Sequence, residues 1–324
     1  MHRRDFLKKG TLAASLAASG KALQPLVAGE TPAAGSSIPR RALGRTGEKL
    51  SIIALGGIVV TDTPQTFANN IVAEAFDRGI NYFDVAPTYG NAQERLGPAL
   101  EPYRKKSFLA CKTTKRDKAG SQQELEESLR LLRTDHLDLY QFHAVTTKED
   151  VEKIFAPNGA METFQAARKA GKTRFLGFSA HSVENALDML SRFDFDTILF
   201  PINFVLFSQA NFGPQVLKRA HEKQMGILAL KAMAKGAWPK AKRKDHPFPK
   251  CWYEPAALPE QASMGLRWTL SQPITAAVPP GEEKYFRQAM DVAQTFKPIS
   301  AEEEKTLMAS AAGVEPIFHL GTSA

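Results

Sequence analysis

The sequence predicts a (β/α)8 TIM barrel, an α/β fold, preceded by an N-terminal β-hairpin. From Ser51 onward, eight short apolar runs rich in β-branched residues alternate with segments of helical periodicity. Strands that alternate with helices pair in parallel through right-handed crossovers. The chain of 324 residues is long enough for one such barrel, which typically needs ~250 residues. An open doubly wound sheet is the alternative, but no Gly-x-Gly-x-x-Gly turn follows the first run.

The predicted strands and helices follow one another in order along the chain. The strands are expected at residues 51–56, 81–85, 107–112, 137–143, 174–179, 197–202, 226–231 and 275–278. Helices such as 122–132, 161–170, 183–191, 215–223 and 259–270 lie between them, each with apolar residues at three- and four-residue spacing. Eight strands are the number that closes a barrel of this class.

Two further segments are assigned from their composition. Residues 41–50 are expected to form two short extended pieces around a glycine-rich turn, a hairpin that closes the bottom of the barrel. Residues 232–258 are rich in Lys and Pro and are expected to be irregular; they leave the seventh strand, where active-site loops belong. The basic run 240–244 within them is either a solvated loop or a site for an anionic substrate or cofactor phosphates.

The N-terminus carries a pattern of its own. Arg3 and Arg4 precede Phe6 and Leu7, and a weakly apolar run follows over residues 11–26. This arrangement resembles a twin-arginine export signal. The run is interrupted by polar residues, so it lacks the ~20 consecutive apolar residues of a membrane-spanning helix.

We therefore predict a signal peptide over residues 1–34 and the barrel domain over residues 38–324. The expected partner is the twin-arginine translocation machinery, the expected location is outside the cytoplasm, in the periplasm, and no permanent membrane anchor is expected. An amphipathic or disordered N-terminus is the alternative.

Composition narrows the possible functions. The balance of 43% hydrophobic and 23% charged residues is typical of a soluble globular protein. The net charge is +8, but three of these charges fall in the leader and the rest form no arginine-rich helix, so nucleic-acid binding is not expected. Two cysteines, Cys111 and Cys251, are too few for a disulfide framework and have the wrong pattern for a zinc site, so no metal is expected.

Four chemically active side chains follow three consecutive strands. Asp84 and Tyr89 come at the end of the second strand and just after it, Lys112 ends the third, and His143 ends the fourth. Barrel enzymes place reactive groups at these C-terminal ends. Each residue alone has an ordinary structural explanation, but a lysine and an aspartate on apolar strands must be paired. We expect the Lys112 ammonium to lower the pKa of Tyr89, which makes the phenol a proton donor, and His143 to polarise a carbonyl group.

At these positions the chain resembles the aldo-keto reductase superfamily, over about residues 41–296. The shared motifs are Leu-Gly-Arg-Thr-Gly at 43–47, Phe-Asp-Val-Ala-Pro-Thr-Tyr-Gly at 83–90, Asp-Leu-Tyr-Gln-Phe-His at 138–143 and Gly-Phe-Ser at 177–179. The resemblance implies hydride transfer between a nicotinamide cofactor and a carbonyl carbon, while Tyr89 protonates the oxygen. It also implies that Lys112 lowers the pKa of the tyrosine, Asp84 holds the lysine and His143 orients the carbonyl.

The resemblance further implies a set of cofactor contacts. These are Gly57, Ser179, Asn203, Lys231, Gly236, Gly281 and Arg287. The chain departs from the family pattern at Ala180, where many members have asparagine, and at Leu199, where they have glutamine, so Asn203 is the nearest polar candidate. Glu283 occupies a position that is often basic, and its carboxylate would repel a 2′-phosphate. NADP and NAD both stay open, with NADP slightly favoured.

The function predicted from the sequence is an NAD(P)(H)-dependent oxidoreductase that reduces aldehydes or ketones, or oxidises the corresponding alcohols, with a small-molecule carbonyl compound or alcohol as its substrate. The alternative is a nicotinamide-binding regulatory or partner protein that uses the same barrel with little turnover.

Overall fold

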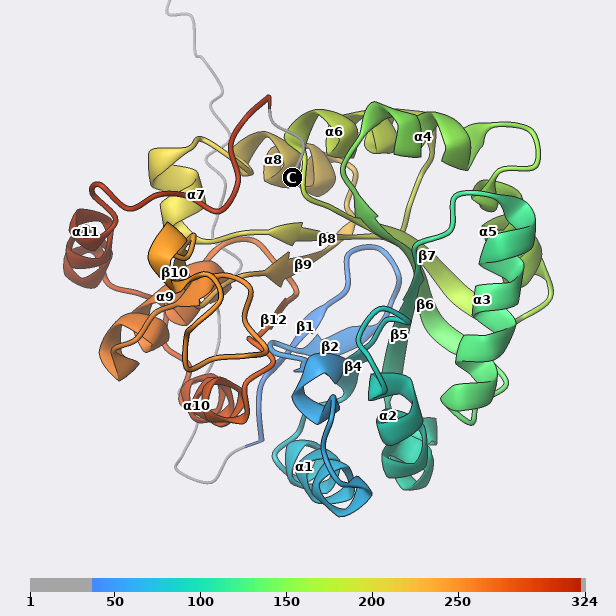
Figure 1. Cartoon of the computed structure of the whole chain (residues 1–324), viewed down its shortest axis with the longest axis horizontal. Helices are drawn as coiled ribbons and strands as arrows, with labels where there is room; N and C mark the ends of the chain where they lie inside the picture. Colours follow the sequence, from blue (N-terminus) through green and yellow to red (C-terminus); the bar gives the residue numbers. More distant parts are fainter. Residues whose placement is uncertain (1–36, 322–324) are drawn as a thin grey trace, which may run out of the picture.

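The computed structural model describes residues 37–321 and contains the predicted barrel. Its main sheet has eight parallel strands in the order β12-β9-β8-β7-β6-β5-β4-β3, and the helices lie outside them (Figure 1). The strands are β3 (Leu55–Gly56), β4 (Tyr82–Asp84), β5 (Phe108–Thr113), β6 (Leu137–Val145), β7 (Thr173–Ala180), β8 (Thr197–Pro201), β9 (Gly226–Leu230) and β12 (Ala276–Val278). All eight predicted strands are thereby confirmed. The predicted leader, residues 1–34, lies outside the described residues.

The first and last strands meet, so the sheet curls into a barrel. Ile53, just before β3, forms a parallel bridge with Ala277 in β12. The Ala54 N–H donates to the Ala277 carbonyl at 3.0 Å, and the Ala277 N–H donates to the Ile52 carbonyl at 2.9 Å. Contact between the two edges protects backbone groups that an open sheet would leave unpaired.

Helices separate the strands as the periodicity predicts. The α-helices are α1 (Gln65–Asp77), α2 (Ala92–Leu100), α3 (Lys118–Leu131), α4 (Lys148–Phe155), α5 (Ala160–Lys169), α6 (Val183–Arg192), α7 (Phe204–Gln209), α8 (Pro214–Glu222), α9 (Pro259–Ser271), α10 (Glu283–Gln294) and α11 (Ala301–Ser310). Three short 3₁₀ helices are η1 (Gly57–Val60), η2 (Glu101–Lys106) and η3 (Lys240–Lys242). The five helices predicted by range are present. The largest difference is the earlier start of α3, where the Asp117 carboxylate caps the helix by accepting from the Gly120 N–H at 2.8 Å.

The predicted hairpin closes the bottom of the barrel. Its strands are β1 (Arg40–Ala42) and β2 (Lys49–Ser51), which pair antiparallel. Leu43 and Leu50 are fully buried among the inward-facing side chains of the barrel. Gly44, with φ +50°, lies so near β9 that an added Cβ would be 2.3 Å from the Gly226 nitrogen, so only glycine fits there.

Two apolar layers stabilise the fold. The inner layer fills the barrel and comprises Leu43, Leu50, Ala54, Tyr82, Phe108, Ala110, Leu139, Leu199, Leu228 and Ala276. The larger outer layer lies between the strands and the helices, and Cys111 belongs to it. Cys111 points away from the barrel axis, as expected for the neighbour of an inward lysine, and accepts from Gln93 Nε2 of α2 at 3.3 Å. Cys111 and Cys251 are both free thiols.

The segment 232–258 is more regular than the sequence indicates. Strands β10 (Ala234–Gly236) and β11 (Glu254–Pro255) form a small antiparallel sheet over the C-terminal face of the barrel. Between them Trp238 stacks on His246, with ring centroids 4.2 Å apart, and its Nε1 donates to the Cys251 carbonyl at 2.9 Å. The expectation of an irregular segment was therefore wrong at its two ends. The basic run 240–244 is exposed to solvent.

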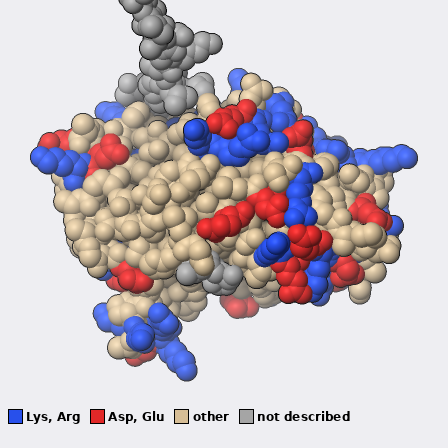
Figure 2. Space-filling view, turned by 90° about the horizontal axis from the view of Figure 1, so that it is seen from above, with Lys and Arg blue, Asp and Glu red and all other residues tan. Residues whose placement is uncertain are grey.

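The described surface carries charges of both signs. In the view of Figure 2, lysine and arginine side chains are interspersed with aspartate and glutamate, and a broad uncharged area lies beside them. Over residues 37–321, no helix is long and apolar enough to cross a membrane, and no group of three or more His, Cys, Asp or Glu side chains is placed to hold a metal ion.

Candidate active site

The four side chains singled out in the sequence come together at the C-terminal end of the barrel. Asp84 ends β4, Lys112 lies in β5 and His143 in β6, while Tyr89 lies in the turn between β4 and α2. Lys112 Nζ forms an ion pair with Asp84 Oδ1, and both side chains are buried. The ammonium also donates to the Val85 carbonyl at 3.2 Å. The charges on these apolar strands are therefore paired, as burial requires.

The second oxygen of Asp84 is held by two side chains that the sequence did not single out. Tyr82 donates its hydroxyl proton to Asp84 Oδ2 at 3.2 Å, and Gln141 Nε2 donates to the same oxygen at 3.3 Å. Both donors are fully buried. Gln141 is the register partner of Lys112, so its side chain points into the barrel with the lysine. Strand register is thus the signal that would have identified it.

Tyr89 is positioned by a tight turn and by two cationic or polar neighbours. Its backbone N–H donates to the Ala86 carbonyl at 3.1 Å, and its carbonyl accepts from the Thr61 hydroxyl at 3.0 Å. The phenol ring lies 5.0 Å from Lys112 Nζ and 5.6 Å from the imidazole of His143, which it meets edge to face at 87°. The tyrosine therefore faces both the lysine and the histidine.

The pKa of Tyr89 corrects one expectation from the sequence. Burial, the largest effect, raises it above the ordinary value; the Lys112 ammonium lowers it, and Asp84 raises it further. The expected lysine effect is present, but the net shift is upward because removal from water outweighs it. Asp84 and Tyr89 in turn raise the pKa of Lys112 above that of an ordinary lysine despite its burial. The site thus holds a neutral phenol beside a permanently charged ammonium.

His143 is a neutral imidazole across the physiological range. Burial lowers its pKa to about 2, and the positive charge of Lys112 adds to the shift. Its Nδ1 lies 3.3 Å from the Thr88 hydroxyl. When Thr88 donates to Nδ1, the ring carries its proton on Nε2 and can donate it to a ligand oxygen.

A second group of side chains lies near the mouth, close to the tetrad formed by Asp84, Tyr89, Lys112 and His143. Lys231 follows β9 in the left-handed region, with φ +66°, and its Nζ lies 4.7 Å from the ring of Trp252 and 4.5 Å from that of Tyr253. His181 follows β7 and stacks on Phe318 of the C-terminal segment at 4.9 Å. His181 was missed in the sequence, although it lies only two positions after the expected contact Ser179.

Three of the expected cofactor contacts lie around the barrel mouth. Gly57 begins η1, where an added Cβ would be 2.7 Å from Val85 Cγ2. Gly281 follows β12, where an added Cβ would be 2.3 Å from Ile58 Cγ2, so the two glycine segments pack closely together. Ser179 is buried, and its Oγ accepts from the Ala144 N–H at 2.8 Å, which leaves the hydroxyl proton to be donated.

The remaining expected contacts have structural partners. Asn203 caps α7, since its Oδ1 accepts from the Leu206 N–H at 2.8 Å and its Nδ2 donates to the Lys231 carbonyl at 3.1 Å. Gly236 packs against the C-terminal segment, where an added Cβ would be 2.7 Å from the Glu315 carbonyl. Arg287 pairs with Glu283 at 2.9 Å and with Glu74. A phosphate at Arg287 would therefore compete with two carboxylates.

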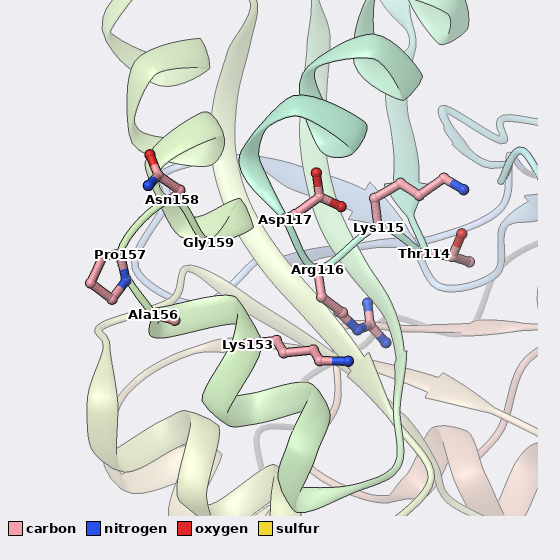
Figure 3. Close-up of a pocket in the computed structure, with 9 residues that line it drawn as sticks. All are labelled: Thr114, Lys115, Arg116, Asp117, Lys153, Ala156, Pro157, Asn158 and Gly159. Atoms are coloured by element: carbon pink, nitrogen blue, oxygen red, sulfur yellow. The ribbon is translucent and has the colours of Figure 1, made fainter.

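A separate surface hollow of about 490 Å³ lies beside α3 and α5. Figure 3 shows the two loops that face each other across it, and it is lined by Thr114, Lys115, Arg116, Asp117, Lys153, Ala156, Pro157, Asn158 and Gly159. The Arg116 guanidinium is paired with Asp150 at 2.9 Å and donates to the His143 carbonyl at 2.7 Å. The hollow contains no tetrad side chain, and its arginine serves to fix the backbone under His143.

Comparisons with known proteins agree with this geometry. Residues 53–307 match the model of the aldo/keto reductase family. The chain is 27% identical to the uncharacterized oxidoreductase YqkF of Bacillus subtilis over 61% of its own length and 65% of that protein. It is 27% identical to L-galactose dehydrogenase of Arabidopsis thaliana over 62% of its length and 67% of that enzyme. The chain thus spans about two thirds of these relatives.

The fold is also that of a solved structure. The holo form of aldo-keto reductase AKR11C1 from Bacillus halodurans superposes with a TM-score of 0.66 and 20% identity, over 86% of this chain and 98% of that one. At 20% identity this similarity concerns the fold alone. The chemistry is argued from the geometry of the four side chains.

Proposed function

The chain belongs to the aldo/keto reductase family, and from this premise we propose that it is an NAD(P)(H)-dependent oxidoreductase that reduces aldehydes or ketones, or oxidises the corresponding alcohols. The observation that carries the proposal is the Asp84–Lys112 ion pair beside the ring of Tyr89, which also meets the imidazole of His143 edge to face. A proton donor and a carbonyl-orienting donor therefore face one space.

The residues around the mouth fit a nicotinamide cofactor. The hydroxyl of Ser179 retains a proton to donate, and the closely packed glycine segments at Gly57 and Gly281 allow the backbone there to approach a ligand. When bound, the cofactor would supply the hydride for the carbonyl carbon or accept it from the alcohol. NADP is slightly favoured over NAD in this proposal, and Leu199 offers no amide to it.

The chain's own residues perform the proton chemistry. His143 donates from Nε2 to the carbonyl oxygen and so fixes its position beside the Tyr89 hydroxyl. Tyr89 gives its proton to that oxygen as negative charge develops there. The Lys112 ammonium stabilises the phenolate that results, and Asp84, held by Tyr82 and Gln141, keeps the ammonium in place. A neutral phenol with a raised pKa is the right protonation state for reduction at neutral pH.

The test combines cofactor titration with turnover. Nicotinamide fluorescence is followed as NADPH or NADH is added, and rates are then measured on a panel of aldehydes, ketones and sugars. Tyr89→Phe is expected to lower kcat by about 10²–10⁴-fold, the usual contribution of a general acid, with cofactor affinity unchanged. Tyr103→Phe, at a partly buried tyrosine of η2, is the matched control and is expected to keep the wild-type rate.

Three results would contradict the proposal. Unchanged reduction by Tyr89→Phe would remove the tyrosine from the mechanism. No fluorescence change with either cofactor would remove the nicotinamide chemistry. Cofactor binding followed by a single turnover and a stall would instead favour a regulatory or partner protein.

A further inference from the structure

We propose that Lys231 and His181 form a subsite that binds a carboxylate on the substrate, so that the protein acts on carbonyl compounds that carry one negative charge. This inference rests on the proposed function and names its substrate class. The subsite lies on the rim of the same barrel mouth, beyond the tetrad. It uses a cation and an imidazole that the proton chemistry leaves without a role.

The first observation is a partly buried ammonium without an acidic partner. Trp252 and Tyr253 flank Lys231 Nζ at 4.7 Å and 4.5 Å. Within residues 37–321 the ammonium makes no ion pair, and burial lowers its pKa to about 8. A partly buried ammonium without a counter-ion, flanked by two aromatic rings, marks a candidate site for an anion. The left-handed backbone at Lys231, φ +66°, adds strain that a solvent-facing lysine would not need.

The second observation is a buried nitrogen on His181 that has no partner. Its Nε2 is removed from solvent and makes no hydrogen bond to any described residue. The ring is fixed by stacking on Phe318 at 4.9 Å with the planes 16° apart. Burial lowers the pKa of His181 to about 3, so the ring is neutral and can donate a single N–H. An ammonium and a neutral N–H donor together match the two oxygens of a carboxylate.

The third observation places this pair beside His143. Trp252, which flanks Lys231, meets Phe318, which stacks on His181, with ring centroids 5.8 Å apart. The backbone N–H of His181 donates to the Val145 carbonyl at 3.3 Å, two residues after His143. The charge of Lys231 also lowers the pKa of both His143 and His181, which agrees with an ammonium near both rings. Lys112 is neutralised by Asp84 and Arg116 by Asp150, which leaves Lys231 as the uncompensated charge among these three. Lys231 was expected from the sequence to contact the cofactor. We assign its side chain to the substrate instead.

The experiment compares two aldehydes that differ in charge and little else. The wild-type protein, with the cofactor that binds it more tightly, is assayed on 4-formylbenzoate and 4-formylbenzamide. We expect kcat/KM to favour the benzoate by at least about tenfold. Lys231→Met is expected to abolish this preference through KM, with cofactor affinity unchanged, and Lys231→Arg to restore part of it. Lys235→Met is the matched control, because Lys235 lies four residues away and is paired with Glu254 at 2.9 Å.

A binding measurement keeps the test independent of turnover. The non-reducible probes 4-carbamoylbenzoate and terephthalamide are titrated against tryptophan fluorescence, since Trp252 adjoins the ammonium. We expect the benzoate to bind at least about tenfold more tightly, and His181→Gln and Lys231→Met each to reduce that difference while circular dichroism stays native.

The outcomes separate the two proposals. Equal use of both aldehydes by the wild type would overturn the subsite and leave the proposed reductase function standing. Weaker cofactor binding in Lys231→Met, with both aldehydes affected alike, would assign the ammonium to the cofactor phosphates and also overturn it. If neither aldehyde were reduced but the charged probe still bound through Lys231, the subsite would stand and the proposed reaction would fail.

Discussion

At the scale of single residues, the main feature of the site is that its buried charges are paired. Asp84 and Lys112 cancel each other inside the barrel, so a neutral tyrosine can lie beside an ammonium at little electrostatic cost. Tyr82 and Gln141 give the aspartate two donors besides the lysine. The raised pKa of Tyr89 then follows from burial, and it favours the protonated phenol that carbonyl reduction requires.

Two partly buried histidines make stability depend on pH. The pKa of His143 is lowered to about 2 and that of His181 to about 3, both by burial first. The unfolded chain takes up these protons near pH 6.5, while the folded protein does not. Stability from this source is therefore fully present above about pH 6.5 and is lost as pH falls. Each histidine contributes a slope of at most about 1.4 kcal/mol per pH unit.

This pH dependence is tested by measuring the free energy of unfolding of variants by urea denaturation between pH 7 and pH 4.5. His181→Gln is expected to flatten the pH dependence of the free energy of unfolding, whereas exposed His221→Gln should retain the wild-type slope. Asp150 and Glu303, whose pKa values are also lowered, contribute slopes of the same sign, so the difference between variants is the measurement. An unchanged slope in His181→Gln would show that its ring is solvated in the native state.

At the scale of elements, the connection from β8 to α7 supports the loop that carries Lys231. Asn203 caps α7 through Oδ1 and holds the Lys231 carbonyl through Nδ2. Its side chain therefore ties the exit of β9 to the start of a helix. The sequence suggested the same residue as a cofactor contact because it is the polar residue nearest to Leu199.

Variants of Asn203 separate the two roles. Asn203→Ala is expected to lower the free energy of unfolding by about 0.5–2 kcal/mol, the usual cost of losing a cap. Asn203→Asp keeps the capping oxygen and should restore that part of the stability. Exposed Ser208→Ala on the same helix should stay within about 0.5 kcal/mol of wild type. If Asn203→Asp kept its stability but lost cofactor affinity, the amide would be a cofactor contact after all.

At the scale of the whole molecule, the closed barrel positions the residues at its C-terminal end. Segments that come after β9 in the chain cover that end. Bonds between residues 52–54 and Ala277 hold the ring. The small β10–β11 sheet and the segment after α11 lie over its C-terminal end, where the Ala237 N–H donates to the Glu315 carbonyl at 3.1 Å. Phe318, from near the end of the chain, reaches His181.

The predicted leader concerns the whole protein, since a twin-arginine signal delivers a folded domain. We propose export to the periplasm, and mass spectrometry of separated cell fractions should find the exported form shortened near residue 34. Arg3→Lys with Arg4→Lys should keep the full-length chain in the cytoplasm, while Lys8→Gln with Lys9→Gln serves as the control for lost charge. A full-length wild-type chain found only in the cytoplasm would contradict the export proposal.

The sequence by itself predicted the barrel and the bottom hairpin, and it singled out the four side chains that the structure brings together at the barrel mouth. Periodicity is a local property, and strands of a parallel barrel place their C-terminal ends at one edge, so residues such as Lys112 and His143 could be brought together from the strand count alone. The helix start at Asp117 and the β10–β11 sheet were missed because caps and short pairings depend on single hydrogen bonds.

Only the tertiary structure decided the balance of charge in the site. Burial raises the pKa of Tyr89 although the neighbouring lysine lowers it. The spacing of residues in the sequence does not show how deeply a side chain is buried. Contacts between distant segments decided the rest. They paired Arg287 with Glu74 and Glu283, made Asn203 a helix cap, and stacked Phe318 on His181. These roles arise where chain ends and loops meet in space, which a linear pattern does not encode.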